Sequence, residues 1–250
     1  MSPVNRHVRT LLASVIAGAW LAGCASTQPS PTLSASATVA PPPQAAPGEP
    51  AGRADLAAAP EGNLYGEMKD GGFVVPALRP GQVGSAFLRK TVAYSTKEAP
   101  GTIVVDPTRH YLYYVEEGGR ATRYGIGVGR EGFAWAGEAT IKSKQEWPDW
   151  YPPKEMVERR PDLKKQLVEL QSGLGMHGGP GNPLGARAMY LWQGDRDTLF
   201  RIHGTNEPWT IGQSQSSGCI RMVNQDAMDL YQKAAVGTRV VVLPASVARR

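Results

Sequence analysis

Short apolar runs rich in Val, Ile, Tyr and Thr recur after about residue 100, and Gly or Pro residues separate them. Runs of this length and composition are typical of β-strands. Gly118-Gly119 between two runs predicts a hairpin, and Asp106-Pro107-Thr108 predicts a turn. The folded part is therefore expected to be mainly β. The expected strands span residues 102–105, 111–115, 123–128, 188–191, 199–202 and 239–243.

Two segments depart from this pattern and predict helices. Residues 154–171 carry a charged face that suits exposure to solvent. Residues 225–233 space their apolar side chains as one stripe of a helix, and Asn224 is placed to cap the first turn. Few helices are thus expected beside many strands.

The N-terminus predicts export. Arg6, His7 and Arg9 precede an apolar stretch at residues 11–21 that is too short for a comfortable membrane span, so residues 1–23 are predicted to be a signal peptide. The stretch ends in Leu-Ala-Gly-Cys, which resembles a bacterial lipoprotein box with Cys24 as the lipidated residue. Ala25 and Ser26 follow Cys24, so no Asp stands at the retention position, and the resemblance to lipoprotein sorting implies an outer-membrane anchor facing the periplasm.

Composition divides the rest of the chain. Residues 24–60 are dominated by Ala, Pro and Ser, lack a hydrophobic period and are predicted to be a disordered tether. Residues 61–100 form an N-terminal extension whose role the sequence leaves open. Residues 101–243 are the expected folded domain, and residues 244–250 a C-terminal tail.

The net charge of +5 includes the signal-peptide arginines, and the remaining excess is spread along the chain. No basic stripe interleaved with aromatic residues appears, so a nucleic-acid partner is not expected. A mildly basic surface suits an anionic cell-wall polymer, although solubility alone explains it equally well.

The chain has two cysteines, for which an exported protein would by default form a disulfide. Lipidation would consume the Cys24 sulfur, so a Cys24–Cys219 bridge is disfavoured. Cys219 is then expected to be a thiol.

Cys219 lies in Ser-Ser-Gly-Cys-Ile-Arg-Met, and Ile-His-Gly-Thr around His203 lies shortly upstream. An imidazole activates a thiol by taking its proton or by stabilising the thiolate. Gly218 leaves room for a substrate carbonyl to approach the sulfur. Either residue taken singly would more often be structural, but the pair predicts a nucleophile and its base.

These two motifs resemble the L,D-transpeptidase family, with its YkuD-like or ErfK-like catalytic domain. The resemblance extends to the Gly/Pro/Asn segment at residues 178–185 and to the strand at residues 102–105, and covers about residues 101–243. It implies a YkuD-like β-sandwich with a few short helices and acyl transfer on peptidoglycan stem peptides. It implies no cofactor.

The resemblance also implies residue roles. Cys219 matches the nucleophile, and His203 the base that takes the thiol proton and returns it to the leaving amine. Gly204 matches the position whose carbonyl orients the imidazole, and Gly218 belongs to the oxyanion region. Many relatives have His where this chain has Ser217, so His203 is expected to move the proton alone.

Four residues are expected to contact the substrate: Ser217, Arg221, Trp209 and His177. Arg221 stands where many relatives have Asn, and it would bind a substrate carboxylate or form a structural ion pair. Trp209 is expected in the wall of the cleft rather than in the core. His177 would line the cleft; a zinc site with His203 and Cys219 is disfavoured, because the spacing of tight metal ligands is missing.

The predicted reaction forms 3-3 cross-links in the wall or attaches a protein to it. Two alternatives stay open: water would resolve the same thioester in an L,D-carboxypeptidase or hydrolase, or the chain would be a non-catalytic wall-binding lipoprotein. The motif itself does not distinguish the acceptors.

Overall fold

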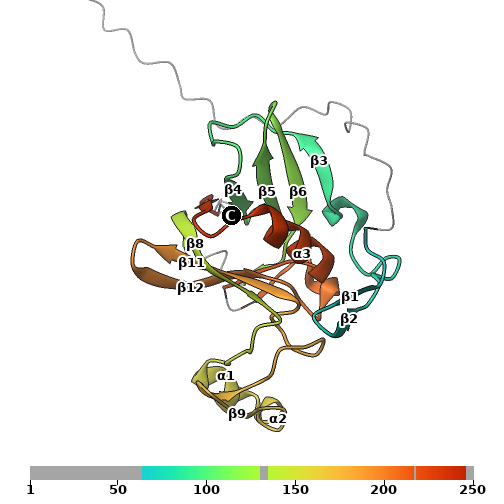
Figure 1. Ribbon diagram of the computed structural model, residues 1–250, viewed down its shortest axis with the longest axis vertical. Helices are drawn as coiled ribbons and strands as arrows, with labels where there is room; N and C mark the ends of the chain where they lie inside the picture. The colour runs from blue at the N-terminus through green and yellow to red at the C-terminus, as the bar shows by residue number, and fades with distance from the viewer. Residues whose placement is uncertain (1–63, 130–134, 217, 246–250) are drawn as a thin grey trace, which may run out of the picture. The chain divides into compact units, whose positions relative to one another are not determined.

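The computed structural model describes residues 64–129, 135–216 and 218–245 (Figure 1). The predicted signal peptide, Cys24 and tether lie outside the described residues. Strands are the main secondary structure of the described residues, which confirms the mainly β prediction. The strands are β1 (Met68–Asp70), β2 (Phe73–Val75), β3 (Lys90–Ala93), β4 (Ile103–Asp106), β5 (Tyr111–Glu116), β6 (Arg120–Gly125), β7 (Val128–Gly129), β8 (Gly137–Glu146), β9 (Val168–Leu170), β10 (Gly173–Gly175), β11 (Arg187–Gln193), β12 (Arg196–His203), β13 (Ser214–Ser216), β14 (Ile220–Arg221) and β15 (Arg239–Val242). The helices are α1 (Lys154–Arg159), α2 (Pro161–Lys164) and α3 (Asn224–Lys233), with 3-10 turns η1 (Ser85–Phe87) and η2 (Pro208–Thr210).

A nine-stranded mixed sheet has the order β14-β12-β11-β8-β15-β4-β5-β6-β3. Antiparallel pairs predominate, while β15 runs parallel to β4 and β14 runs parallel to β12. The predicted hairpin joins β5 to β6, with Gly118 and Gly119 at φ +72° and +68°, where a side chain would be strained. The order places β12 and β14 at one edge of the sheet.

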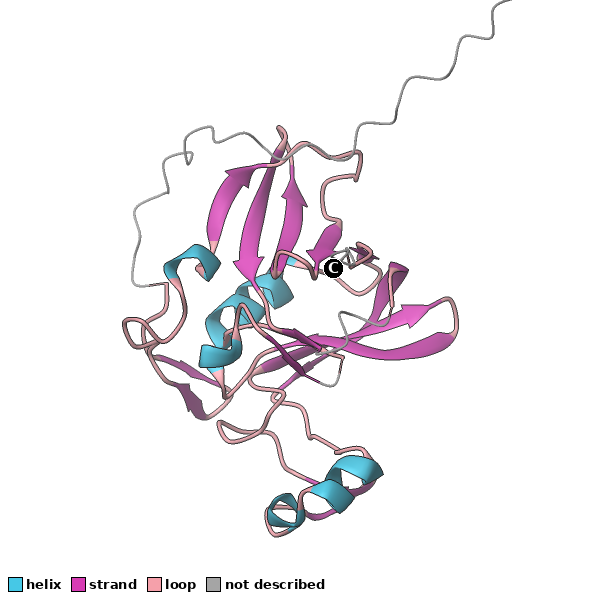
Figure 2. Cartoon of the chain, turned by 180° about the vertical axis from the view of Figure 1, so that it is seen from behind, coloured by secondary structure: helices cyan, strands magenta, loops and turns pink. Residues whose placement is uncertain are grey.

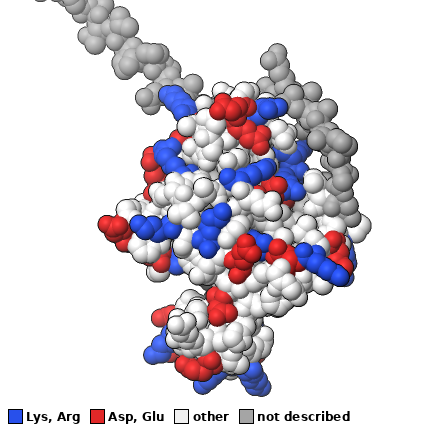
Figure 3. Space-filling model, in the orientation of Figure 1, with Lys and Arg blue, Asp and Glu red and all other residues white. Residues whose placement is uncertain are grey.

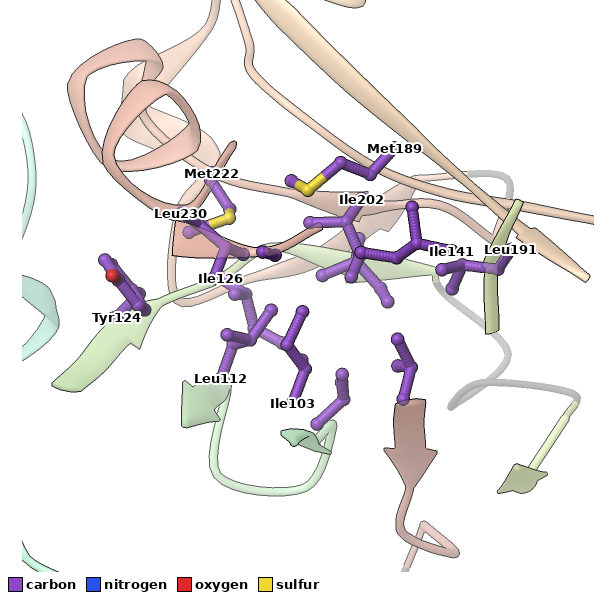
Figure 4. Close-up of a cluster of buried hydrophobic side chains, with 14 of the residues drawn as sticks. Ile103, Leu112, Tyr124, Ile126, Ile141, Met189, Leu191, Ile202, Met222 and Leu230 are labelled. Atoms are coloured by element: carbon purple, nitrogen blue, oxygen red, sulfur yellow. The ribbon is translucent and has the colours of Figure 1, made fainter. Parts of the chain in front are cut away.

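The core is formed by the inner faces of the two halves of this sheet and by helix α3. Figures 1 and 2 show α3 between the β4–β6 group and the β8–β12 group. Alternate strand residues supply it, since successive side chains point to opposite faces. Ile103, Met189, Ile202 and Leu230 meet there from four different elements (Figure 4). Full burial of each such side chain contributes about 1.5–3 kcal/mol, enough to hold α3 against the sheet.

The helix predicted over residues 154–171 is wrong in its second half. The segment forms α1, a break at Arg160, the single turn α2 and then strand β9. Pro161 explains the break: its ring disfavours helical geometry at Arg160, and it lacks the N–H that a continuous helix needs. Arg160 accordingly has φ −126° and ψ 76°.

The longest strand, β8, is absent from the sequence prediction although it pairs with both β11 and β15. Its residues alternate between buried and exposed positions: Ala139 and Ile141 are buried, whereas Glu138, Thr140 and Lys142 are exposed. Small and charged residues fill most of its other positions, so the segment does not read as an apolar run. Its partners, not its composition, establish it as a strand.

The segment before residue 100 packs on the same domain. Strand β3 adds to the edge of the sheet beside β6. Arg89 Nη1 lies 2.7 Å from Asp229 Oδ1, and Arg89 Nε lies 3.6 Å from Asp226 Oδ1 on α3. The Tyr65 hydroxyl donates to Asp226 at 3.2 Å and accepts from the Arg89 N–H at 2.6 Å. These contacts fix the extension against helix α3.

Basic and acidic side chains are interspersed on the face drawn in Figure 3, which shows no extended basic stripe. In the described part of the chain, no helix has both the length and the apolar character that crossing a membrane requires.

Candidate active site

The parallel pair β12–β14 builds the site. Ile202 lies opposite Ile220, and His203 lies opposite Arg221. Both isoleucines are fully buried in the core. Because strand side chains alternate between faces, His203 and Arg221 lie together on the other face of this pair.

Cys219 immediately precedes β14, so the same register continued by one residue places it beside Arg201. Both the backbone and the guanidinium of Arg201 act on the thiol. Arg201, His203, Cys219 and Arg221 therefore occupy four neighbouring positions on one face. Strand register therefore brings the end of β12 and the loop before β14 to the same face of this pair.

Gly218 allows the chain to reach this position. Its φ is +132°, and a Cβ there would lie 3.0 Å from Cε1 of Phe200. Any larger residue would be strained in the backbone and would press on the aromatic ring. The glycine before Cys219 is thus a geometric requirement.

His203 is buried, with 4% of its surface exposed. Its Nδ1 lies 2.6 Å from the Gly204 carbonyl oxygen, which only a donating Nδ1–H satisfies. That leaves Nε2 as the basic nitrogen. Burial lowers the pKa of His203 to about 4; the Gly204 carbonyl opposes this shift and the Arg221 charge adds to it. The imidazole is therefore neutral at pH 7.

Cys219 carries a thiol and is partly buried. Burial raises the pKa of Cys219, while the Arg201 backbone and the charges of Arg201 and Arg221 partly offset that rise. Because the pKa of Cys219 is raised and that of His203 is lowered, the resting state has a neutral thiol and a neutral imidazole. Proton transfer then accompanies attack of the sulfur, as in general-base catalysis.

Arg221 is a buried cation with 8% of its surface exposed. Its nearest carboxylate is Glu207, with Nη1 and Oε2 3.9 Å apart. Within the described residues, its Nε and Nη2 have no hydrogen-bond acceptor. Gly127 admits the guanidinium, since a Cβ there would lie 3.3 Å from Nη2. A buried guanidinium with unused donors is suited to binding a carboxylate.

Trp209 lies at the surface in η2, with 52% of its area exposed. It lines a pocket of about 350 Å³ together with Thr205, and Val74 and Arg79 of the N-terminal segment line the same pocket. Thr205 follows the His203-Gly204 pair directly in the chain, but neither His203 nor Cys219 lines this pocket.

His177 lies in solvent, with 74% of its side chain exposed and its Nδ1 3.5 Å from Asp149 Oδ1. This environment differs from the buried position of His203. Among residues 64–129, 135–216 and 218–245, no three or more His, Cys, Asp and Glu side chains form a group that would hold a metal ion. Ser217 lies outside the described residues.

Asn224 does not cap α3 as predicted. The helix begins at this residue, and no side-chain capping bond forms. Instead, Asn224 Oδ1 accepts a hydrogen bond from the Ala186 N–H at 2.9 Å. Sequence reasoning thus missed its real partner. It also missed Arg201, although two-residue alternation with His203 would have placed both on one face.

The YkuD family model, described as an L,D-transpeptidase catalytic domain, matches residues 100–242. The chain belongs to this family. Among curated proteins, a probable L,D-transpeptidase ErfK/SrfK of Escherichia coli strain K12 is 32% identical over 148 residues. That alignment covers 56% of this chain and 43% of the relative, so the chain spans less than half of that protein's length.

Solved structures are also similar to this chain. A protein of Brucella melitensis, described as a probable carnitine operon oxidoreductase, is 52% identical over 64% of this chain and 96% of its own, with a TM-score of 0.42. That description concerns the Brucella protein. An L,D-transpeptidase of Mycobacterium smegmatis is 18% identical over 57% and 58% of the two chains, with a TM-score of 0.40. Since both scores are below 0.5, family membership rests on the sequence match.

Proposed function

We propose that the chain is an L,D-transpeptidase that acts on peptidoglycan stem peptides through a thioester on Cys219. The observation that carries this proposal is the β12–β14 register, which sets His203 opposite Arg221, with Cys219 one residue before β14. His203 Nδ1 is bonded to the Gly204 carbonyl. Family membership supplies the substrate class.

In the first step, Cys219 Sγ attacks the carbonyl carbon that joins the third stem residue, a diamino acid, to a D-residue at position four. His203 Nε2 takes the thiol proton as the C–S bond forms. The C–N bond then breaks, and the imidazolium returns the proton to the leaving amine. The products are a thioester and a D-amino acid.

In the second step, the side-chain amine of another stem attacks the thioester carbonyl. His203 accepts the amine proton, the C–S bond breaks, and the proton passes to the departing sulfur. Backbone N–H groups around Gly218 are proposed to stabilise the negative charge on the carbonyl oxygen in both steps. A 3-3 cross-link forms and the thiol is restored.

Arg221 is proposed to bind a substrate carboxylate next to the thiol. Its buried, unused donors support this role over that of a structural ion pair, because the Glu207 contact at 3.9 Å is long. Ser217, Trp209 and His177 remain proposed substrate contacts, with Trp209 the best supported of these because its pocket adjoins Thr205.

The test is to incubate the purified protein with disaccharide-tetrapeptide and to analyse the products by mass spectrometry. The variants are Cys219→Ser and His203→Ala, and Cys24→Ser is the matched cysteine control. Cross-linked dimers and a released D-amino acid, lost only in the two site variants, are expected. Trimmed tripeptide alone would establish a carboxypeptidase. Turnover that survives Cys219→Ser would overturn the thioester.

Attachment of a wall-bound protein uses the same thioester with a different amine or donor, so it is proposed only as an alternative outcome. A non-catalytic wall-binding role is disfavoured by the Cys219 and His203 pair, since binding alone needs neither a thiol nor an oriented base. A Cys219→Ala strain with unchanged wall chemistry would support the binding role.

Lipid attachment at Cys24 and an outer-membrane, periplasm-facing location are also proposed, on the sequence of residues 1–24. Labelling of cells with radioactive palmitate tests the lipid attachment. The full-length protein should incorporate label, and Cys24→Ser should not.

A further inference from the structure

The Asn224 side chain lies next to two glycines, Gly185 and Gly204, that come from different parts of the chain. A Cβ at Gly185 or at Gly204 would lie only 2.2 Å from Asn224 Oδ1. Gly185 also has φ +63°, a conformation that favours glycine. The two glycines thus create the space that the amide fills.

The Asn224 amide is hydrogen-bonded to one of these two segments, and a backbone hydrogen bond ties the segments to each other. Asn224 Oδ1 accepts a hydrogen bond from the Ala186 N–H at 2.9 Å. The Gly204 N–H donates to the Arg187 carbonyl at 2.9 Å. Residues 185–187 are therefore held along the end of β12 at the point where His203 projects.

Both segments present a backbone carbonyl to the His203 ring. The Gly204 carbonyl lies 2.6 Å from Nδ1. The Leu184 carbonyl also interacts with the ring and favours its protonated form. Leu184 directly precedes Gly185, so both carbonyls are attached to glycines that contact the Asn224 amide.

We propose that Asn224 is a positioning residue, which fixes the orientation and tautomer of the His203 imidazole by locking the Leu184 and Gly204 carbonyls in place. In this role Asn224 acts through these carbonyls and not on the reacting atoms, although it also lines the pocket beside Trp209. The inference rests on the proposed function, because orientation of His203 matters only if His203 moves the proton.

Three variants separate this role from general stability. Asn224→Ala removes the amide, while Asn224→Asp keeps an oxygen acceptor for the Ala186 N–H. Gln225→Ala is the matched control: Gln225 is the next residue of α3, and its amide donates to the Gly66 and Pro76 carbonyls at 3.3 and 3.0 Å. It therefore deletes an α3 amide whose partners do not contact His203.

The readouts are release of D-amino acid from tetrapeptide, the melting temperature, and ¹⁵N NMR of the His203 ring in the full chain. Asn224→Ala should lower kcat about 10- to 100-fold, since a misplaced catalytic group costs about this much, with KM within about threefold. Its ring nitrogens should report a mixture of tautomers. Asn224→Asp should recover most of kcat, and Gln225→Ala should lower the melting temperature but not kcat.

Two failures are distinguishable. If His203→Ala turns over like the unmodified protein, the proposed function itself is wrong. If His203→Ala is inactive, but Asn224→Ala matches Gln225→Ala in kcat and retains a single Nδ1–H tautomer, only the role of Asn224 is overturned.

Discussion

His203 and Arg221 are register partners in the parallel pair β12–β14, so the base stands beside a buried guanidinium. The positive charge disfavours a second one on the imidazole and contributes to its lowered pKa. The same charge favours the thiolate of Cys219. Arg221 thus eases loss of the thiol proton and keeps the imidazole unprotonated at rest, while it also makes that imidazole a weaker base.

The first prediction concerns the resting protonation state. Burial holds the pKa of His203 at about 4, below the ordinary value of about 6.5. Titration followed by ¹⁵N NMR should therefore show a neutral ring at pH 7 that gains a proton only near pH 4. Thiolate absorbance at 240 nm should be absent at pH 7. An imidazolium together with a thiolate at that pH would contradict the neutral pair.

The low pKa of His203 also affects stability. Between about pH 4 and 6.5 the unfolded chain binds the proton that the folded chain excludes, so this group lowers stability as pH falls through that window. His203→Gln should flatten that part of the profile. The measurement is urea unfolding at pH 4.5, 5.5, 6.5 and 7.5.

The second prediction concerns the crowding at Gly204. Gly204→Ala should destabilise the protein by about 1–3 kcal/mol, because its Cβ would overlap the Asn224 amide. In an Asn224→Ala background, the next neighbour of that Cβ is Ala186 N at 3.1 Å. The second substitution should therefore recover much of the loss in urea unfolding. Strict additivity of the two free-energy changes would rule out direct contact.

The third prediction concerns the Arg221 guanidinium. Arg221→Lys keeps a positive charge but loses the planar guanidinium, which binds carboxylates through two parallel hydrogen bonds. KM for a tetrapeptide with a free diamino-acid carboxylate should rise about 10-fold, the loss of one charge-assisted hydrogen bond. KM for the amidated peptide should change little. Equal changes for both peptides would refute carboxylate binding.

The fourth prediction concerns the acidic residues of α3. Arg89 contacts both Asp229 and Asp226, and Asp229 lies closer to it. Complete burial raises the pKa of Asp226 to about 7, and the neighbouring Asp229 adds to the rise. Between about pH 4 and 7 the folded chain then binds more protons than the unfolded chain, so stability is lost as pH rises.

Asp226→Asn cannot lose that proton. Its free energy of unfolding relative to the unmodified protein should therefore increase by on the order of 2 kcal/mol between pH 5 and 8. Asp229→Asn is the matched control: the pKa of Asp229 is lowered by its bond to Tyr124 and by Arg89, so no such increase is expected. Similar slopes for both variants would contradict the assignment.

Local sequence was sufficient for several elements. The strands β4 and β5 and helix α3 formed where apolar spacing predicted them, because their buried faces carry residues of high β or helical preference. Strand β8 was not predictable, since its small and charged residues adopt the strand only between β11 and β15. The 154–171 prediction overlooked Pro161.

The sequence by itself determined the thiol, the imidazole and the glycines that flank them, because those residue types must be present for the chemistry. Tertiary structure decided that Arg201 and Arg221 stand beside Cys219 and His203, and that Asn224 accepts the Ala186 N–H beside Gly185 and Gly204. Strand register and the contact of α3 with the 184–187 loop bring together residues far apart in the chain. Local propensity carries no information about such pairings, which depend on how the buried faces of β12, β14 and α3 pack in one core.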